Sequence, residues 1–345
     1  MDAVSGTVET RDMISFRQLI QLQWSLQTAM AKSPKVDLVG VGLNATDTLI
    51  PLAEYPAPGS KVEFRSANVL PGGQVASAVM ACQSWGLRTR YVGKLGDDHA
   101  AQLHRQEFAS AGVEAQTISV PGCASQQAVI LVDAQGERTV LWRRDQQLGL
   151  LPEELDREWI VNARALHVDG YDTAAATQAA TWARRAGIPT IADLDDTYSG
   201  IDGLLEQIDY AIVSRNVPSR LTDEDDLEKS LPLIKRRYGC QLAAATLGED
   251  GVLAWDGEQF YYACAYRVPA VDTTGAGDTF HAGFIYGLLQ GWPLERRLDF
   301  GCAAAALNCM GVGARGGIRP VEVIENLMAR GDRYTPLLDL TSRAS

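Results

Sequence analysis

The 345-residue sequence is poor in histidine, and it has neither paired cysteines nor a long apolar run. Its four histidines are scattered and never take the HExxH-type spacing of a zinc site. No stretch reaches the ~18 apolar residues that a membrane helix needs. The six cysteines include no CxxC pair, and several lie among small apolar residues, which favours reduced, buried thiols. We therefore expect a cytoplasmic protein without a zinc centre or a membrane span.

Positive charge is also scarce, since 31 Lys and Arg residues face 43 Asp and Glu residues, for a formal net charge of -12. Nucleic acids and anionic membranes are bound by clusters of Lys and Arg, and no basic run is present. This excludes both classes of partner from our expectations. Binding of a phosphate-containing ligand stays compatible with the charge, because backbone N–H groups can capture phosphates locally.

Most of the chain alternates short apolar runs with helical patterns, and this alternation predicts a mainly parallel, doubly wound α/β sheet with helices on both faces. We expect one domain over residues 35–335, preceded by an N-terminal extension over 1–34 that is helical or partly disordered, and followed by a tail over 336–345. The first strand is expected over Val36–Gly42, an apolar run that ends in glycine, and a later strand is expected over Tyr266–Val271. The main helices are expected over 74–85, 98–111, 173–186, 278–290 and 294–310.

Two segments depart from this alternation. Residues 47–69 contain Pro51, Pro56 and Pro58 between short β-like pieces. Within residues 127–143, two strands over 128–132 and 138–142 flank a turn at 133–136, a composition typical of a hairpin. Together the two segments predict a small β-rich lid.

The most informative segment for chemistry is D-T-T-G-A-G-D-T-F, residues 272–280, which precedes a helical pattern. A helix N-terminus exposes unpaired N–H groups and a partial positive charge. The small residues Gly275, Ala276 and Gly277 allow a phosphate to approach that backbone. Asp278, in the first turn, can take the proton of an acceptor hydroxyl. The alternative is a glycine-rich turn in which Asp278 only complements the helix dipole.

This nine-residue string, followed by Gly283, resembles the signature of the ribokinase-like, or PfkB, family of carbohydrate kinases. Gly72 and Gly73, followed by a helix, resemble the family's other signature. The resemblance implies a doubly wound core with a small β lid and transfer of the γ-phosphate of ATP to a hydroxyl of a sugar or sugar acid. It also implies that Asp278 is the base and that the Gly275–Gly277 backbone is the anion hole.

The resemblance also implies an ATP site. The turn T-L-G-E-D-G resembles the family turn that borders ATP, through Thr246, Gly248 and Gly251. Asn308, late in the last long helix, resembles a family Asn near the adenine. An ordinary turn between strands and a buried polar residue are the respective alternatives.

For metals, Asn216 resembles the Asn of an N-x-x-E motif that organises Mg²⁺ through water, but Ser219 stands where the motif has Glu. The carboxylate then comes from elsewhere, with Glu249 and Asp250 as candidates, or metal use is altered. The Asp272 side chain and the carbonyl of Thr274 resemble the family's monovalent-cation site, with oxygen ligands that suit K⁺. The glycine-rich loop over 311–317 resembles the other wall of this cation site. The alternative is that this loop only closes over the adenine.

On the acceptor side the resemblance implies contacts from Asp47 at the base of the lid, from Gly72 and Gly73, and from Ser77. Gln74 and Ser77 differ from the residues usual in the family. Asp169 ends a predicted strand, and ligands of open α/β sheets bind at the carboxyl ends of strands. Arg143 and Arg144, at the end of a lid strand, either bind an anionic group of the acceptor or are solvated charges.

Three functions follow from the sequence. A sugar kinase is the leading interpretation, and a nucleoside kinase of the same family is the nearest alternative. The third is a non-catalytic, kinase-like protein that binds a metabolite, an interpretation favoured by Ser219 and by the N-terminal extension. The family resemblance also implies a homodimer formed through the lid.

Overall fold

The computed structural model describes residues 35–134 and 138–335. In this part of the chain a nine-stranded sheet has the order β13-β12-β11-β10-β9-β8-β1-β4-β5. All neighbouring strands from β11 to β5 pair in parallel, and β12 and β13 add an antiparallel edge. The bounds are β1 Val36–Val41, β4 Thr89–Leu95, β5 Glu114–Ser119, β8 Ala163–Asp169, β9 Thr190–Leu194, β10 Tyr210–Ser214, β11 Leu242–Thr246, β12 Val252–Trp255 and β13 Phe260–Ala263. The mainly parallel sheet predicted from the sequence is confirmed.

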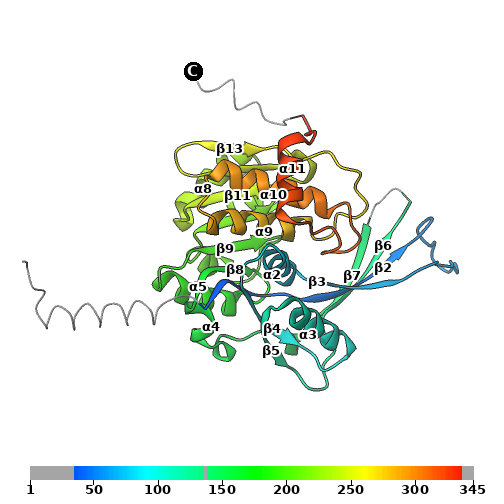
Figure 1. Cartoon of the computed structure of the whole chain (residues 1–345). Helices are drawn as coiled ribbons and strands as arrows, with labels where there is room; N and C mark the ends of the chain where they lie inside the picture. Colours follow the sequence, from blue (N-terminus) through cyan, green and yellow to red (C-terminus); the bar gives the residue numbers. More distant parts are fainter. Residues whose placement is uncertain (1–34, 135–137, 336–345) are drawn as a thin grey trace, which may run out of the picture.

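Helices cover both faces of this sheet (Figure 1). One apolar core lies beneath α4 Arg157–Val161, α5 Thr173–Arg185, α6 Ile201–Leu205, α7 Val217–Thr222 and α8 Leu227–Tyr238. The second core lies beneath α2 Gln74–Ser84, α3 His99–Ala111, α9 Ala276–Leu289, α10 Leu294–Asn308 and α11 Val321–Arg330. Neighbouring residues of β1 divide between the cores, with Val39 in the first and Leu38 in the second. Because both faces are buried, the strands read as nearly continuous apolar runs.

The five long helices predicted from the sequence are confirmed within a few residues, whereas the strand predicted at Tyr266–Val271 is wrong. That segment is irregular, and only Tyr266 forms an isolated bridge, to Arg333. Pro269 lies in its middle, and proline has no N–H to give to a sheet. Three short 3₁₀ turns complete the described structure at η1 Gln146–Leu148, η2 Pro152–Glu154 and η3 Gly248–Asp250.

The lid is a separate four-stranded sheet with the order β3-β2-β6-β7. Its strands are β2 Ala45–Pro51, β3 Asn68–Gly72, β6 Gln127–Val132 and β7 Arg138–Arg143. Leu49, Ala128 and Ile130 form its small apolar cluster. The sheet projects from the body beside α2 and α3 (Figure 1). The predicted extension over 1–34, residues 135–137 of the hairpin turn and the tail over 336–345 lie outside the described residues.

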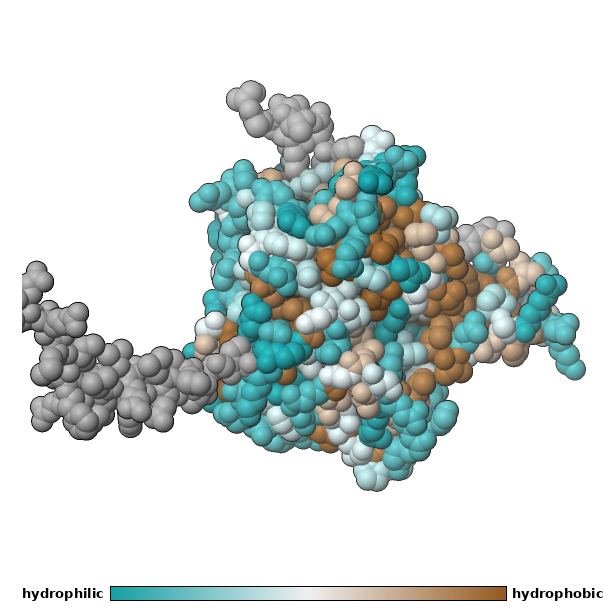
Figure 2. Space-filling model, in the orientation of Figure 1, coloured by the Kyte–Doolittle hydropathy of each residue, from teal (hydrophilic) through white to brown (hydrophobic). Residues whose placement is uncertain are grey.

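The carboxyl ends of the parallel strands meet at one edge of the main sheet. Asp169 ends β8 and is the register partner of Asp193 in β9. The root of the lid begins directly after β1, so it rises beside this edge. The space-filling view shows apolar side chains gathered where the lid joins the body (Figure 2).

Along the described chain no helix has both the length and the apolar character that crossing a membrane requires. The described cysteines form no disulfide.

Candidate active site

The N-terminus of α9 forms the centre of the site. Gly275 precedes the helix with φ 74°, a left-handed conformation that glycine adopts without strain. A Cβ on Gly275 would also lie 2.2 Å from the carbonyl oxygen of Ala314. A Cβ on Gly277, in contrast, would meet no heavy atom within 4 Å. The start of α9 is therefore fixed on one side and open on the other, where its dipole attracts an anionic group.

Asp278 lies in the first turn of α9 and retains its proton to an unusually high pH. Burial raises the pKa of this carboxyl group from 3.8 to about 8, and the negative charge of Asp193 acts in the same direction. The nearby His281 and Arg315 and a hydrogen bond with Ser77 oppose this rise. A carboxylate whose pKa is close to the working pH is matched to accepting a proton from a hydroxyl group.

A buried pair of side chains supports this turn from within the core. The Nδ1 atom of His281 lies 2.8 Å from the carbonyl oxygen of Gly277 and 3.4 Å from a carboxyl oxygen of Asp193. Its Nε2 atom lies 3.3 Å from the carbonyl oxygen of Ile212 in β10. Burial lowers the pKa of His281 and raises that of Asp193. The pair therefore anchors the Gly277 carbonyl to β9 and β10.

Arg315 joins the glycine-rich loop over 311–317 to the acceptor side of the site. Its Nη2 atom donates to the carbonyl oxygen of Gly72 at 2.9 Å, and its Nε atom donates to the hydroxyl of Ser77 at 3.2 Å. Its Nη1 atom forms an ion pair with Glu107, and the Arg315 side chain is only 8% exposed. Burial raises the pKa of Asp47 to about 6, while the charge of Arg315 opposes this rise. The positive charge of Arg315 therefore lowers the pKa of both Asp47 and Asp278 relative to the effect of burial alone.

The base of the lid closes tightly around the predicted acceptor residues. A Cβ on Gly72 would lie 2.3 Å from Oδ2 of Asp47. Gly73 has φ 93°, and a Cβ there would lie 2.4 Å from the Cα atom of Asn44. Gly73 tolerates no side chain, because both its φ and the Asn44 backbone oppose one, whereas a Cβ on Gly72 would displace the Asp47 carboxylate. The pair brings β3 against β2 and directs α2, with Ser77, towards Arg315.

Asp169 organises the loop after β1. It is 1% exposed, and its two oxygens accept the N–H groups of Leu43 at 2.6 Å and Tyr171 at 3.1 Å. Burial raises its pKa to about 8. The predicted contact of Asp169 with a sugar hydroxyl stays a prediction, and its observed bonds fix the backbone at the carboxyl ends of β1 and β8.

A pocket of about 330 Å³ extends from the N-terminus of α9 along α10. Thr246, Gly248 and Gly251, predicted to border ATP, line it together with Ala276 and Gly277. Most other lining residues are small or apolar, namely Ala265, Val268, Ala270, Phe280, Cys302, Ala305, Ala306 and Cys309. Such a wall suits a flat, weakly polar ring such as adenine, and the phosphates would then point to the start of α9.

Asn308 holds the glycine-rich loop against α9. Its side chain is fully buried and is absent from the described residues that line the nucleotide pocket. Its Nδ2 atom donates to the carbonyl oxygens of Thr274 at 3.0 Å and Ala314 at 3.1 Å, and its Oδ1 atom accepts the N–H of Gly317 at 3.2 Å. These bonds use both ends of the amide, and the predicted proximity to adenine stays a prediction.

The residues predicted to hold a monovalent cation bridge the same two segments. The carboxylate of Asp272 accepts the N–H groups of Thr274 at 2.9 Å and Gly313 at 2.8 Å. The carbonyl oxygen of Thr274 accepts from Asn308. Oxygen groups of this kind suit a hard cation, and these two already join the loop to the segment before α9.

The region of the predicted Mg²⁺ motif contains few carboxylates. Asn216 precedes α7, and the Ser219 hydroxyl donates to its carbonyl oxygen at 3.3 Å. Asp250 is paired with Arg215, whereas Glu249 lines the nucleotide pocket. Of the two candidate replacements for the motif Glu, Glu249 is thus the one that faces the pocket. The described residues contain no group of three or more acidic, His or Cys side chains that could hold a metal.

Sequence reasoning missed Arg315, Asp193 and His281. Asp193 lies near the carboxyl end of an apolar strand, and this is the same sequence feature that indicated Asp169. His281 is one turn after Gly277 on α9, a spacing that was available in the sequence. Arg315 lies in an aperiodic glycine-rich loop, and no local pattern predicts its insertion beneath the lid.

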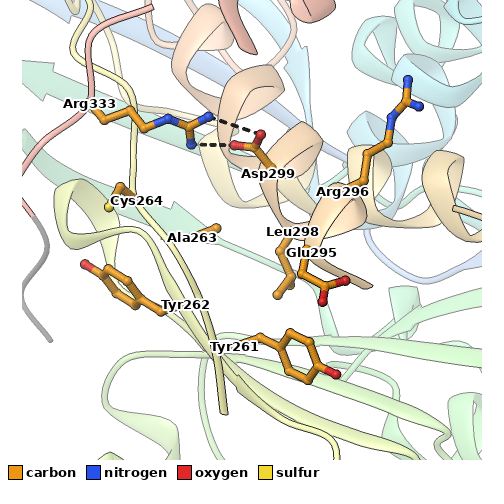
Figure 3. Close-up of a pocket in the computed structure, with 9 residues that line it drawn as sticks. All are labelled: Tyr261, Tyr262, Ala263, Cys264, Glu295, Arg296, Leu298, Asp299 and Arg333. Carbon is orange, nitrogen blue, oxygen red and sulfur yellow. Dashed lines mark hydrogen bonds and ion pairs between the residues drawn. The ribbon is translucent and has the colours of Figure 1, made fainter. Parts of the chain in front are cut away.

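A second cavity, of about 460 Å³, lies between β13 and α10 (Figure 3). Arg333 spans it to form two hydrogen bonds with Asp299, at 2.5 and 3.1 Å. The hydroxyl of Tyr266 also donates to Asp299 at 2.8 Å, and Tyr266 lines the nucleotide pocket. The hydroxyl of Tyr266 thus connects the Arg333–Asp299 ion pair of the second cavity to the lining of the nucleotide pocket.

Comparison with known proteins gives the same fold. Residues 30–320 match the family model described as pfkB family carbohydrate kinase. An ATP-dependent ribose-1-phosphate kinase of Halopiger xanaduensis is 31% identical over 277 residues, or 78% of this chain and 90% of the relative. Acarbose 7(IV)-phosphotransferase of an Actinoplanes species is 28% identical and covers 83% of this chain and 96% of its own. A crystal structure from Agrobacterium tumefaciens, assigned as a ribokinase, superposes with a TM-score of 0.79 at 28% identity, over 85% of this chain and 97% of that one.

Proposed function

We propose that this chain, which belongs to the pfkB family of carbohydrate kinases, transfers the γ-phosphoryl group of ATP to a hydroxyl of a sugar or sugar acid. Asp278 takes the proton of the hydroxyl as its oxygen forms a bond with the γ-phosphorus. The bond between the γ-phosphorus and the β–γ bridging oxygen breaks, and ADP leaves with the bonding electrons. The backbone over Gly275–Gly277 stabilises the charge on the transferring group.

The observation that carries this proposal is the position of Asp278. It lies one turn of helix from Gly275, between the open nucleotide pocket and the lid residues around Arg315. A carboxyl group with a pKa of about 8 titrates close to neutral pH, so it can accept a proton and release it after transfer. A role that only complements the helix dipole gives no reason for this half-buried carboxyl group to lie beside Ser77 and Arg315.

The test is ADP release from Mg·ATP with a panel of sugars, sugar acids and nucleosides, for the wild type and Asp278→Asn. We expect one acceptor class to stimulate turnover, and we expect the variant to lose about 10²- to 10⁴-fold in kcat with little change in ATP binding. Glu322→Gln, an exposed carboxylate in the first turn of α11, is the matched acidic control. A nucleoside as the preferred acceptor would replace the sugar kinase with the nucleoside kinase. If no acceptor stimulates the wild type above Asp278→Asn while ligands still bind, the non-catalytic alternative replaces the kinase, whereas equal stimulated turnover by both proteins would refute the role of Asp278 as the base.

Metal use follows from the same site. We infer that ATP binds as its Mg²⁺ complex, in which phosphates and water would hold the metal and Asn216 and Glu249 would orient that water. K⁺ would bind Asp272 and the carbonyl oxygen of Thr274, where oxygen ligands suit a hard cation. Titration of activity with K⁺ at constant ionic strength tests this site, since Na⁺ or choline at the same strength should not replace a specific ion.

We also infer a homodimer in the cytoplasm. The outer lid strands expose Val69 and Leu141, each about half exposed and both on the same face of the lid, and a second lid would cover them. A cytoplasmic location agrees with a need for ATP and with cysteines that form no disulfide along the described chain. A monomeric mass at assay concentration would refute the dimer, and residence in an ATP-poor compartment would refute the location.

A further inference from the structure

Three aromatic side chains from distant segments gather where the lid faces the carboxyl ends of β8 and β9. The Trp142 ring of β7 lies 6.5 Å from the Tyr171 ring, and Tyr171 lies 5.0 Å from Tyr198. Tyr171 follows β8, and Tyr198 follows β9. We call this set the aromatic cluster. It spans the gap between lid and body, and Tyr198 also packs against the first apolar core.

Trp142 is on the same face of the lid as Asp47. Asp47 is the register partner of Ala128, and Ala128 is the register partner of Trp142. Side chains of paired residues point to the same face of a sheet, and successive residues alternate. Trp142 therefore points to the acceptor side, whereas its neighbour Leu141 points to the opposite face.

The body side of the cluster is built as a fixed support. Gly170 has no side chain where Tyr198 packs, since a Cβ there would lie 2.2 Å from the Tyr198 ring. The hydroxyl of Tyr198 donates to Asp195. The N–H of Tyr171 donates to Asp169 at 3.1 Å, which joins the ring to the predicted acceptor residues. Trp142, in contrast, remains 61% exposed, an unusual state for a Trp in a single chain.

Polar groups surround a narrow cavity next to the cluster. The cavity, of about 10 Å³, has room for one hydroxyl group and is lined by Asn44, Gln126, Arg144 and Asp172, among others. Arg144 donates to Asp172 at 2.6 Å and also lies 5.8 Å from the centre of the Tyr171 ring. Gln126 is 8% exposed, and its Oε1 atom has no hydrogen-bond partner within the described residues. A buried amide oxygen without a partner is costly, and a hydroxyl group of a ligand would satisfy it.

We propose that the aromatic cluster and this polar cavity form a subsite for a second ring of the acceptor, so that the preferred acceptor is a glycoside or oligosaccharide rather than a free monosaccharide. The inference rests on the proposed kinase function and specifies its substrate class. A sugar ring has an apolar C–H face that packs on an aromatic ring and hydroxyl groups at its rim. Trp142 and Tyr171 offer an aromatic surface for the C–H face of the ring, and Gln126 and Asp172 offer hydrogen-bond partners for its hydroxyl groups.

The ring geometry favours a sugar over a nucleobase. A base is held best between parallel aromatic faces or on one flat platform. Here the ring planes of Trp142 and Tyr171 are 88° apart, and those of Tyr171 and Tyr198 are 46° apart. No parallel slot exists among these three rings. A corner of this kind accommodates a puckered ring with C–H groups on two sides.

The test is calorimetric binding of glucose, maltose, acarbose and adenosine to the Asp278→Asn protein, which removes turnover from the measurement. We expect the ligands with two or more sugar rings to bind roughly tenfold more tightly than glucose, a factor within the range of aromatic contacts. Trp142→Ala should abolish this advantage and leave glucose binding unchanged. Leu141→Ala, an equally exposed apolar residue on the other face of the same strand, is the matched control and should change neither.

Each other outcome overturns the inference. Equal binding of glucose and the larger ligands would refute it, as would an equal effect of Trp142→Ala and Leu141→Ala. Tighter binding of adenosine that depends on Trp142 would replace the sugar ring with a base. A wild-type dimer that Trp142→Ala converts into monomers would show that a second chain covers the residue. Because binding is measured without turnover, failure of the kinase proposal appears separately, as absent ADP release in the wild type.

Discussion

Raising the pH from 7 to 9 should increase kcat/KM for the acceptor about tenfold. Asp278 acts as a base only when it is ionised, and its pKa is about 8. About one-eleventh of the molecules carry the carboxylate at pH 7, and about ten-elevenths carry it at pH 9, from the ordinary titration relation. Below pH 7 the rate constant should fall about tenfold for each further unit, because one proton blocks the base.

The assay is coupled ADP release at saturating Mg·ATP and limiting acceptor, at constant ionic strength, from pH 5.5 to 10. Under these conditions kcat/KM reports the groups of the enzyme–ATP complex that are essential before the acceptor binds. The profile of the coupling enzymes alone, and the stability of the kinase at each pH, are the controls. A profile that is flat from pH 6 to 10 would refute the reasoning, because Asp278 would then be ionised throughout.

Three further predictions test Asp278 and its neighbours. Gly275→Ala should lower the free energy of unfolding by at least about 2 kcal/mol in a urea titration, because its Cβ would meet the Ala314 carbonyl and because φ is positive. Gly277→Ala should fold normally in the same titration and should raise KM for ATP in steady-state kinetics. Arg315→Met should raise the pH midpoint of kcat/KM, since its charge lowers the pKa of Asp278, and an unchanged midpoint would contradict this. Asp278→Asn should gain stability over wild type as pH rises from about 4 to above 8. In that range the unfolded carboxyl has released its proton while the native one still holds it, so unfolding of the wild type becomes easier.

The architecture was predictable because its signals are periodic and local. Apolar runs and helical spacing identified most strands and helices, and two proline-rich or hairpin-like segments identified the lid. The segment 266–271 misled the same reasoning, because its apolar residues pack beside the nucleotide pocket without joining the sheet. Pro269 was the available signal against a strand.

The residues of the candidate active site also divide into those that a local sequence pattern predicts and those that only the fold brings together. The start of α9 could be predicted from one continuous string, since Gly275 and Asp278 belong to one turn of helix. Arg315 could not, because it reaches Gly72 and Ser77 across more than 230 residues of sequence, and only the fold creates that contact. The aromatic cluster could not be predicted for the same reason, because Trp142 belongs to the lid strand β7 and Tyr171 to the turn after β8 of the main sheet.

The loop over 311–317 links the two substrate sides of the site. Asp272 and Asn308 hold its backbone on the nucleotide side, and Arg315 extends from its centre to the acceptor side. The charge of Arg315 opposes the raised pKa of both Asp47 and Asp278. Any displacement of this loop would therefore change the ionisation of both carboxyl groups at once.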